Sequence, residues 1–190
     1  MDDRSTVQLQ ALIDRLNTGD TAALNLLIEH ACGRLQLVTR KIRQDFPRLR
    51  NSEETADLLQ KAVIRLLRAL KTTKVATPKE FFRLAAVQVR RELIDMARRP
   101  AWVKNATDIG AGSIEEPSDT TYEPVRLAGW TDFHRKTERL PELEREVFDL
   151  VWYQGMSQAE AAGVLQVSVP TVKRRWLSAR LRLQVVADDR

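Results

Sequence analysis

The chain has 190 residues, 43% of them hydrophobic, and a formal net charge of +5. This length is enough for one medium domain or two small ones. Cys32 is the only cysteine, which excludes disulfides and a cysteine-rich zinc site, and neither histidine has metal-motif spacing, so we expect no metal and no cofactor. The sequence contains no apolar run long enough to span a membrane and no signal peptide, so we expect a cytoplasmic protein without membrane insertion.

Leu, Ala, Arg and Glu are abundant, glycine is scarce and no alternating β-branched run occurs, which predicts an all-α protein. The positive charge lies mostly in residues 1–100, whereas residues 101–130 are net acidic. We expect two small helical domains, residues 1–100 and 124–190, joined by an acidic flexible linker over residues 101–123. Such uneven basicity fits a polyanionic partner, although it also fits a simple solubility feature.

In chain order, two helices come first. Apolar spacing predicts a short helix over residues 7–17 and a long one over residues 21–46, with Asp20 as its cap and Pro47 at its end. The apolar residues of the long helix that we expect to face inward are Ala23, Leu26, Leu27, Ala31, Leu35, Val38 and Ile42.

A third helix is predicted from Ser52 to about Leu70, with two distinct faces. Its apolar face consists of Leu58, Leu59, Ala62, Val63, Leu66 and Leu70. Its other face consists of Asp57, Gln60, Lys61, Ile64 and Arg68. On periodicity alone, the second face is equally well explained as solvated surface.

A fourth helix follows a polar loop over residues 71–77. Thr77, Pro78 and Glu80 form a strong helix start, and Pro100 ends the helix after Arg99. The residues expected to face inward are Phe82, Ala85, Ala86, Val89, Leu93 and Met96. Four arginines fall near one line along the helix, where they would meet phosphates well: Arg83, Arg90, Arg91 and Arg98.

The pattern of residues 140–183 predicts a helix, a tight turn, a second helix, another tight turn and a basic helix. Ser157 and Glu160 form a capping box, Ser168 caps the last helix, and Pro170 is tolerated in its first turn. The expected buried face of that helix is Val172, Trp176, Ala179 and Leu183. Its basic residues point elsewhere, as in a helix-turn-helix that fills a major groove, although an ordinary surface helix also has a charged face.

Two segments resemble one family. Residues 55–66 (Thr-Ala-Asp-Leu-Leu-Gln-Lys-Ala-Val-Ile-Arg-Leu) resemble the Asp-Leu-x-Gln-x-x-Phe-x-Arg-Leu signature of bacterial sigma factor region 2, and residues 82–85 and 91–99 resemble its end. The C-terminal helix-turn-helix resembles region 4. The whole chain therefore resembles a sigma factor of the extracytoplasmic-function (ECF) group, and residues 152–155 (Trp-Tyr-Gln-Gly) resemble its planctomycete-like subset.

This resemblance implies a protein that is not an enzyme, binds core RNA polymerase through the β′ clamp and the β flap, and directs it to promoter DNA. The residues that would bind core polymerase are Asp57, Gln60, Lys61, Ile64 and Arg68. Those that would bind the minus-ten element are Lys71, Lys74, Lys79, Arg83, Arg90, Arg91 and Arg98, with the Lys71–Lys79 loop taking a flipped base.

The recognition helix would lie in the major groove of the minus-thirty-five element. Its candidate contacts are Ser168, Pro170, Thr171, Lys173, Arg174, Arg175 and Arg180. Among these, Thr171, Arg174 and Arg175 are the base-edge candidates, whereas Lys173 and Arg180 are assigned to phosphates.

The sequence departs from the family pattern at several positions. Lys61 stands where an acidic residue is usual, Leu84 where an aromatic residue is common, and Arg91 where Asn is common. Gln166 stands in the turn where Gly is usual, at a cost on the order of 1 kcal/mol if the backbone is left-handed there. Leu177 and Leu181 lie away from the buried face and are interpreted as a docking patch.

Two other functions compete with this interpretation. Residues 140–183 alone equally resemble the output domain of a LuxR-type regulator, which binds DNA without core polymerase. A helical protein that sequesters a partner is the second alternative. The family resemblance also allows an anti-sigma factor as a partner, which the sequence does not identify.

Overall fold

The computed structural model describes residues 3–45, 52–97 and 127–185, and every regular element within these ranges is a helix. The first half contains α1 (Asp3–Asn17), α2 (Thr21–Asp45), α3 (Ser52–Thr72) and α4 (Pro78–Ala97). The second half contains α6 (Leu127–Glu138), α7 (Glu142–Phe148), the π-helix η3 (Asp149–Tyr153), α8 (Gln158–Leu165) and α9 (Val169–Val185). The predicted all-α fold is therefore confirmed, whereas the acidic linker over residues 101–123 lies outside the described residues.

Side-chain caps fix where several helices begin. Asp20 accepts a hydrogen bond from the backbone N–H of Ala22 at 2.8 Å, as the sequence predicts for the start of α2. At α4, Thr77 accepts from the N–H of Glu80 at 3.2 Å. The Glu80 carboxylate accepts from the N–H of Ala76 at 2.7 Å, one residue before the expected partner. These bonds satisfy backbone donors that a helix start leaves unpaired.

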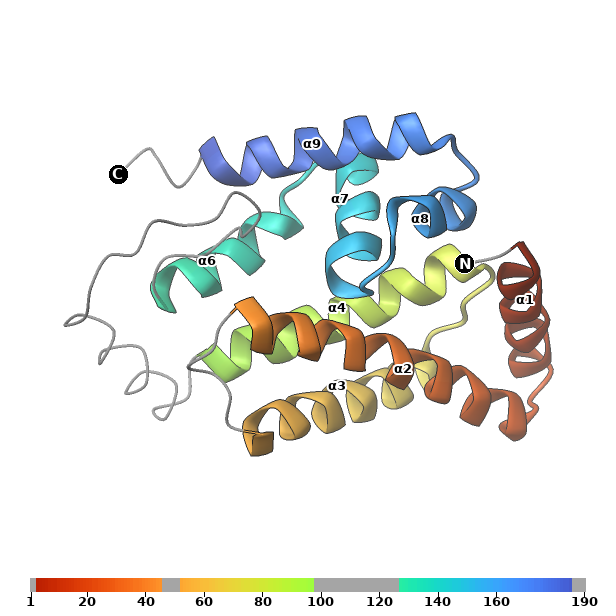
Figure 1. The fold of residues 1–190 in the computed structure, drawn as a ribbon. Helices are drawn as coiled ribbons and strands as arrows, with labels where there is room; N and C mark the ends of the chain where they lie inside the picture. The colour runs from red at the N-terminus through yellow and green to blue at the C-terminus, as the bar shows by residue number, and fades with distance from the viewer. Residues whose placement is uncertain (1–2, 46–51, 98–126, 186–190) are drawn as a thin grey trace.

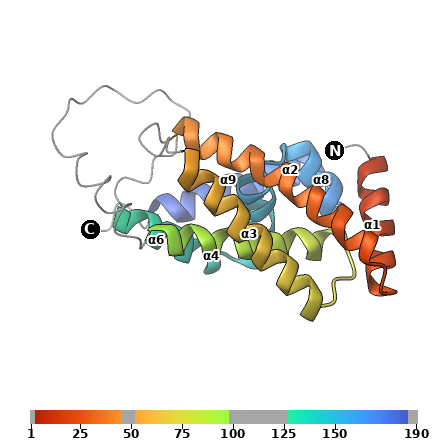
Figure 2. The ribbon, with the colours of Figure 1, turned by 90° about the horizontal axis from the view of Figure 1, so that it is seen from below.

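The helices are stacked in layers (Figure 1). Helices α2 and α3 lie on one side of α4, and the helices of the second half lie on its other side, with α9 farthest from α3. Seen from below, α3 and α2 cross in front of α4 and α9 (Figure 2). Helix α4 therefore lies between α2 and α3 of the first half and the helices of the second half.

Two clusters of buried apolar residues hold this arrangement, and each contains residues of both halves. In one, Val89 and Leu93 of α4 share the core with Phe148 and Tyr153. In the other, Phe81 and Phe82 share it with Val147 and Leu150. Burial of such side chains contributes about 1.5–3 kcal/mol each. The two predicted domains are thus packed against each other, a relationship that their separate sequence patterns do not reveal.

Most expected core positions are buried, including all six on α4. One expectation for α2 is wrong, because Leu26 is 43% exposed. Its position satisfies the helical period, but its side chain lines a surface pocket together with Gln8 and Leu12 of α1. The side chain of Ile42 lies outside the described residues.

Candidate nucleic-acid interface

The helix-turn-helix forms as its sequence predicts. The capping box of α8 is complete, with Ser157 accepting from the N–H of Glu160 and the Glu160 carboxylate accepting from the N–H of Ser157. Ser168 accepts from the N–H of Thr171 at 3.3 Å at the start of α9. Gln166 between the two helices is left-handed, with φ 53°, which confirms the expected strained turn.

Helix α9 is held from behind by α7. Val172, Ala179 and Leu183 are buried, and the ring of Trp176 stacks on Phe148 with centroids 5.3 Å apart. Glu144 of α7 accepts a hydrogen bond from Ser178 at 2.8 Å and forms an ion pair with Arg182 at 2.8 Å. This packing fixes which face of α9 is presented to solvent.

The presented face of α9 carries the predicted minus-thirty-five contacts. The exposed ones are Ser168, Pro170, Lys173 and Arg174, and the partly exposed ones are Thr171, Arg175 and Arg180. Leu177 and Leu181 are also exposed, by 56% and 50%. A basic helix face of this shape, free of the rest of the protein, can enter a major groove.

The predicted polymerase-binding face of α3 also points to solvent. Gln60, Ile64 and Arg68 are exposed, and Asp57 and Lys61 are partly exposed. Lys61 forms an ion pair with Asp57 one turn away, at 2.7 Å. The departure from the family pattern at Lys61 therefore places a cation beside the acidic residue of the same face.

The loop before α4 is anchored to α1. Gln10 donates a hydrogen bond to the carbonyl of Ala76 at 2.8 Å, and Asn17 donates to the carbonyl of Val75 at 2.8 Å. Val75 is buried, whereas Lys71 and Lys74 are exposed. The structure thus holds the loop in a defined shape with its lysines outward.

The predicted row of arginines on α4 is not a single exposed row. Arg83 and Arg91 are exposed, and Arg98 lies outside the described residues. Lys79 at the start of α4 is 45% exposed and pairs with Glu146 of α7 at 2.7 Å. Arg90, however, is only 2% exposed, so in this arrangement it cannot contact DNA, contrary to the expectation from its spacing.

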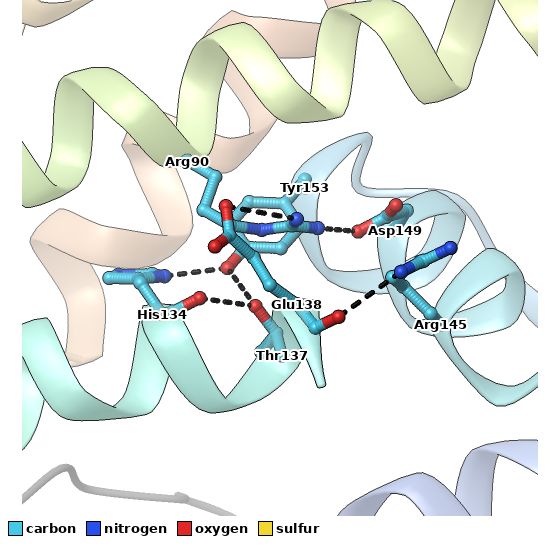
Figure 3. A network of polar contacts seen from close by, with 7 residues as sticks. All are labelled: Arg90, His134, Thr137, Glu138, Arg145, Asp149 and Tyr153. Carbon is cyan, nitrogen blue, oxygen red and sulfur yellow. Dashed lines mark hydrogen bonds and ion pairs between the residues drawn. The ribbon is translucent and has the colours of Figure 1, made fainter. Parts of the chain in front are cut away.

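Arg90 is the centre of a buried polar network (Figure 3). Its guanidinium forms an ion pair with the carboxylate of Asp149 and lies 4.9 Å from the centre of the Tyr153 ring. Glu138 approaches the same guanidinium at 3.9 Å. The Tyr153 hydroxyl in turn lies 2.6 Å from Nδ1 of His134. The network therefore joins α4 of the first half to α6 and η3 of the second.

Burial controls the charge state of this network. It raises the pKa of Asp149 to about 6, and Arg90 offsets only part of that effect. Burial, together with the nearby charge of Arg90, lowers the pKa of His134 well below its ordinary value. At neutral pH, Asp149 is thus ionised beside Arg90, whereas His134 is neutral beside the Tyr153 hydroxyl.

Sequence reasoning did not single out the acidic partners in this contact, Asp149 and Glu146. Both lie on the inner side of α7 and η3, and they are only 3% and 8% exposed. Their position among apolar residues of a buried face could have identified them, because an acidic residue on such a face needs a cationic partner.

Comparison with known proteins decides the family. The family described as ECF sigma factor matches residues 6–189. The chain belongs to the ECF sigma factor family. It directs transcription initiation with core RNA polymerase, as members of this family bind core polymerase and promoter DNA. The match includes both halves, whereas a LuxR-type output domain would account for the second half alone.

Individual relatives are similar over most of their length. This sigma factor is 27% identical to the RNA polymerase sigma-H factor of Pseudomonas aeruginosa over 186 residues, which cover 91% of this chain and 90% of that protein. It is 28% identical to the ECF RNA polymerase sigma-E factor of Escherichia coli over 185 residues, which cover 90% of each. A solved structure of CnrH in complex with the cytosolic domain of CnrY covers 94% of this chain and 96% of that chain, with 22% identity and a TM-score of 0.40.

None of the helices in the described part of this sigma factor combines the length and the apolar character that a membrane crossing requires.

Proposed function

We propose a division of labour among three surfaces of this sigma factor. The α3 face of Asp57, Gln60, Lys61, Ile64 and Arg68 binds the β′ clamp of core polymerase. Helix α4 and the loop before it bind the minus-ten element, and α9 binds the minus-thirty-five element while the second half contacts the β flap. The protein performs no catalytic step itself and acts by positioning polymerase.

The observation that supports this proposal is the position of α3 and α9 at opposite sides of the fold (Figure 1). Ile64 is 38% exposed in the middle of a polar face, and an exposed apolar residue among charges suits a protein contact. On α9, basic and apolar side chains share the outward face, which suits base edges and phosphates. Membership of the planctomycete-like subset, supported by residues 152–155, and an anti-sigma partner stay predictions from the family resemblance.

The test replaces Ile64 with Glu and measures capture of the sigma factor by purified core polymerase, followed by run-off transcription. We expect affinity for core polymerase to fall by about tenfold or more, equivalent to about 1.4 kcal/mol. Leu26→Glu is the matched control, because Leu26 is 43% exposed on α2 and lies outside the proposed surface. Equal losses for both variants would contradict the assignment of the α3 face.

A further inference from the structure

The loop between α3 and α4, residues 73–77, is bonded to α1 at two successive carbonyl groups. Asn17 donates a hydrogen bond to the carbonyl of Val75 at 2.8 Å, and Gln10 donates to the carbonyl of Ala76 at 2.8 Å. The two donors are seven residues apart in sequence, which places them on the same face of α1. Helix α1 lies beside this loop (Figure 2) and carries none of the residues proposed to bind polymerase or DNA.

Burial and a helix cap hold the same part of the loop. Val75 is 3% exposed and belongs to the apolar cluster that contains Leu9 and Ile13 of α1. The backbone N–H of Ala76 donates to the carboxylate of Glu80 at 2.7 Å. Residues 75 and 76 are therefore held by α1, by the core and by the start of α4, which gives them one defined position.

Thr73 and Lys74 lie between the end of α3 and these two anchored residues. Both are exposed. The N–H of Thr73 bonds to the carbonyl of Ala69 at 2.8 Å, which continues the hydrogen-bond pattern of α3. A short segment between two fixed points has few backbone conformations available to it. The directions in which the side chains of Thr73 and Lys74 point thus depend on the bonds from α1.

The chemistry of this loop makes a fixed geometry important. Residues 71–77 contain no aromatic side chain, and Phe81 and Phe82 of α4 are fully buried. An unpaired base therefore cannot stack on an aromatic ring here, although stacking is the contact that accepts any base. The remaining groups are the hydroxyl of Thr73 and the ammonium of Lys74, whose hydrogen bonds weaken steeply with distance and angle. Recognition of a base by such groups requires a backbone that stays in place.

We propose that Gln10 and Asn17 of α1 are positioning residues for base recognition in the minus-ten element. They contact no DNA themselves. They hold the loop so that Thr73 and Lys74 meet one unpaired base of the non-template strand in a single geometry, which lowers the entropy lost when that base binds. This inference rests on the proposed role of the loop before α4 in minus-ten binding.

The test removes each donor at nearly unchanged side-chain size and charge, with Asn17→Leu and Gln10→Met. Gln8→Met is the matched control, because Gln8 is exposed on the same helix but lines a pocket that α1 forms with α2. Neither Asn17 nor Gln10 belongs to the buried core, so we expect all three variants to fold. Circular dichroism and thermal denaturation verify this.

The readout is base preference. Core polymerase loaded with each variant selects from promoter DNA that is opened over the minus-ten element, with the unpaired non-template bases randomised, and the bound DNA is sequenced. We expect each donor variant to reduce the preference at one base position by at least about fivefold, equivalent to about 1 kcal/mol. Preferences at the other positions and capture by core polymerase should match those of Gln8→Met. Unchanged preference at every position, or an equal loss at all of them, would overturn the proposal.

A double-mutant cycle separates positioning from a general loosening of the fold. Thr73→Ala with Lys74→Ala removes the side chains that Asn17 is proposed to position. In this background, Asn17→Leu should cause no further loss of base preference, because the two changes act on the same contact. Additive losses would show that Asn17 acts on DNA by another route and would contradict the positioning role.

The same measurements separate this inference from the proposed function. If the wild-type holoenzyme selects bases in the opened strand and loses that selection with Thr73→Ala and Lys74→Ala but not with the donor variants, the loop binds minus-ten DNA and the positioning role is wrong. If the wild type selects no base, or the loop variants alter no preference, the proposed role of the loop in minus-ten binding is itself wrong.

Discussion

Helices α4 and α9 both carry arginines at helical spacing, but the exposure of these arginines differs between the two helices. Arg90 of α4 is 2% exposed and surrounded by Asp149, Tyr153 and Glu138. Arg174 of α9 is exposed. The difference comes from what each helix packs against, because α7 lies along one side of α9 and leaves Arg174 exposed, whereas α4 is covered by both halves. A basic residue is therefore available to bind DNA only when no other part of the fold supplies its counter-charge.

Removal of the carboxylate that pairs with Arg90 should produce the largest difference in the free energy of unfolding between changes at α4 and at α9. Asp149→Asn leaves the guanidinium of Arg90 without its buried carboxylate, and we expect the free energy of unfolding to fall by about 3–5 kcal/mol. Arg174→Ala on exposed α9 should change it by no more than about 0.5 kcal/mol. Urea denaturation followed by circular dichroism measures both. Similar losses in the two variants would show that the burial of Arg90 does not distinguish the helices.

The exposed arginines should differ in the kind of DNA contact that they make. Arg174→Ala is expected to reduce discrimination at one base pair of the minus-thirty-five element by about 1–3 kcal/mol. Arg91→Ala on α4 should weaken binding to all promoters alike and reduce the salt slope by about 0.7–0.9. Binding of the polymerase holoenzyme to a set of promoter variants at several salt concentrations separates the two effects. Sequence-independent losses for both would refute base recognition by Arg174.

The Arg34–Glu160 pair allows the contact between the halves to be tested by pH. Burial alone would raise the pKa of Glu160, but hydrogen bonds from Arg34 and Ser157 outweigh it and lower the pKa from 4.5 to about 2. A lowered pKa gives stability that is complete above the unfolded value and is lost as pH falls through the folded value. The carboxylate should therefore stabilise the protein at pH 7 and cease to do so near pH 2.

Glu160→Gln isolates this effect, since Gln can still close the capping box with Ser157. We expect the variant to be less stable than the wild type by about 1–2 kcal/mol at pH 7. The difference should shrink between about pH 5 and pH 2, in line with the linkage of protonation to folding. Urea denaturation across this range measures it, and a pH-independent difference would mean that the Arg34 ion pair contributes nothing.

The substitution Gly163→Ala lies inside α8 and should leave the arginine-bearing helices α4 and α9 unchanged. A Cβ atom at Gly163 would meet no atom within 4 Å, so Gly163→Ala should raise the free energy of unfolding by about 0.5–1 kcal/mol. Thermal denaturation measures this gain, with promoter binding as the control. A loss of stability, or altered promoter affinity, would contradict the open surroundings of Gly163.

Local features of this sigma factor could be predicted from sequence because neighbouring residues determine them. The capping box of Ser157 and Glu160, the Ser168 cap and the left-handed Gln166 are all confirmed. The buried stripe of α4 is confirmed as well, since helical periodicity directly indicates a buried face.

The environment of Arg90 could not be predicted in the same way. Its partner Asp149 is 59 residues away in sequence, and the pattern of either helix alone does not show that they meet. Leu26 illustrates the converse, because its spacing suits a core position but it stays 43% exposed. Periodicity identifies a face, whereas tertiary packing decides whether that face is covered.

The distance between the two halves tests most directly whether the second half packs against α2 and α4 as in this structure. Spin labels at the exposed positions Asn25→Cys of α2 and Gly163→Cys of α8, in a Cys32→Ser background, report that distance by electron paramagnetic resonance. We predict one narrow, short distance in the free sigma factor. A broad or long distance distribution would contradict the packing of the second half against α2 and α4.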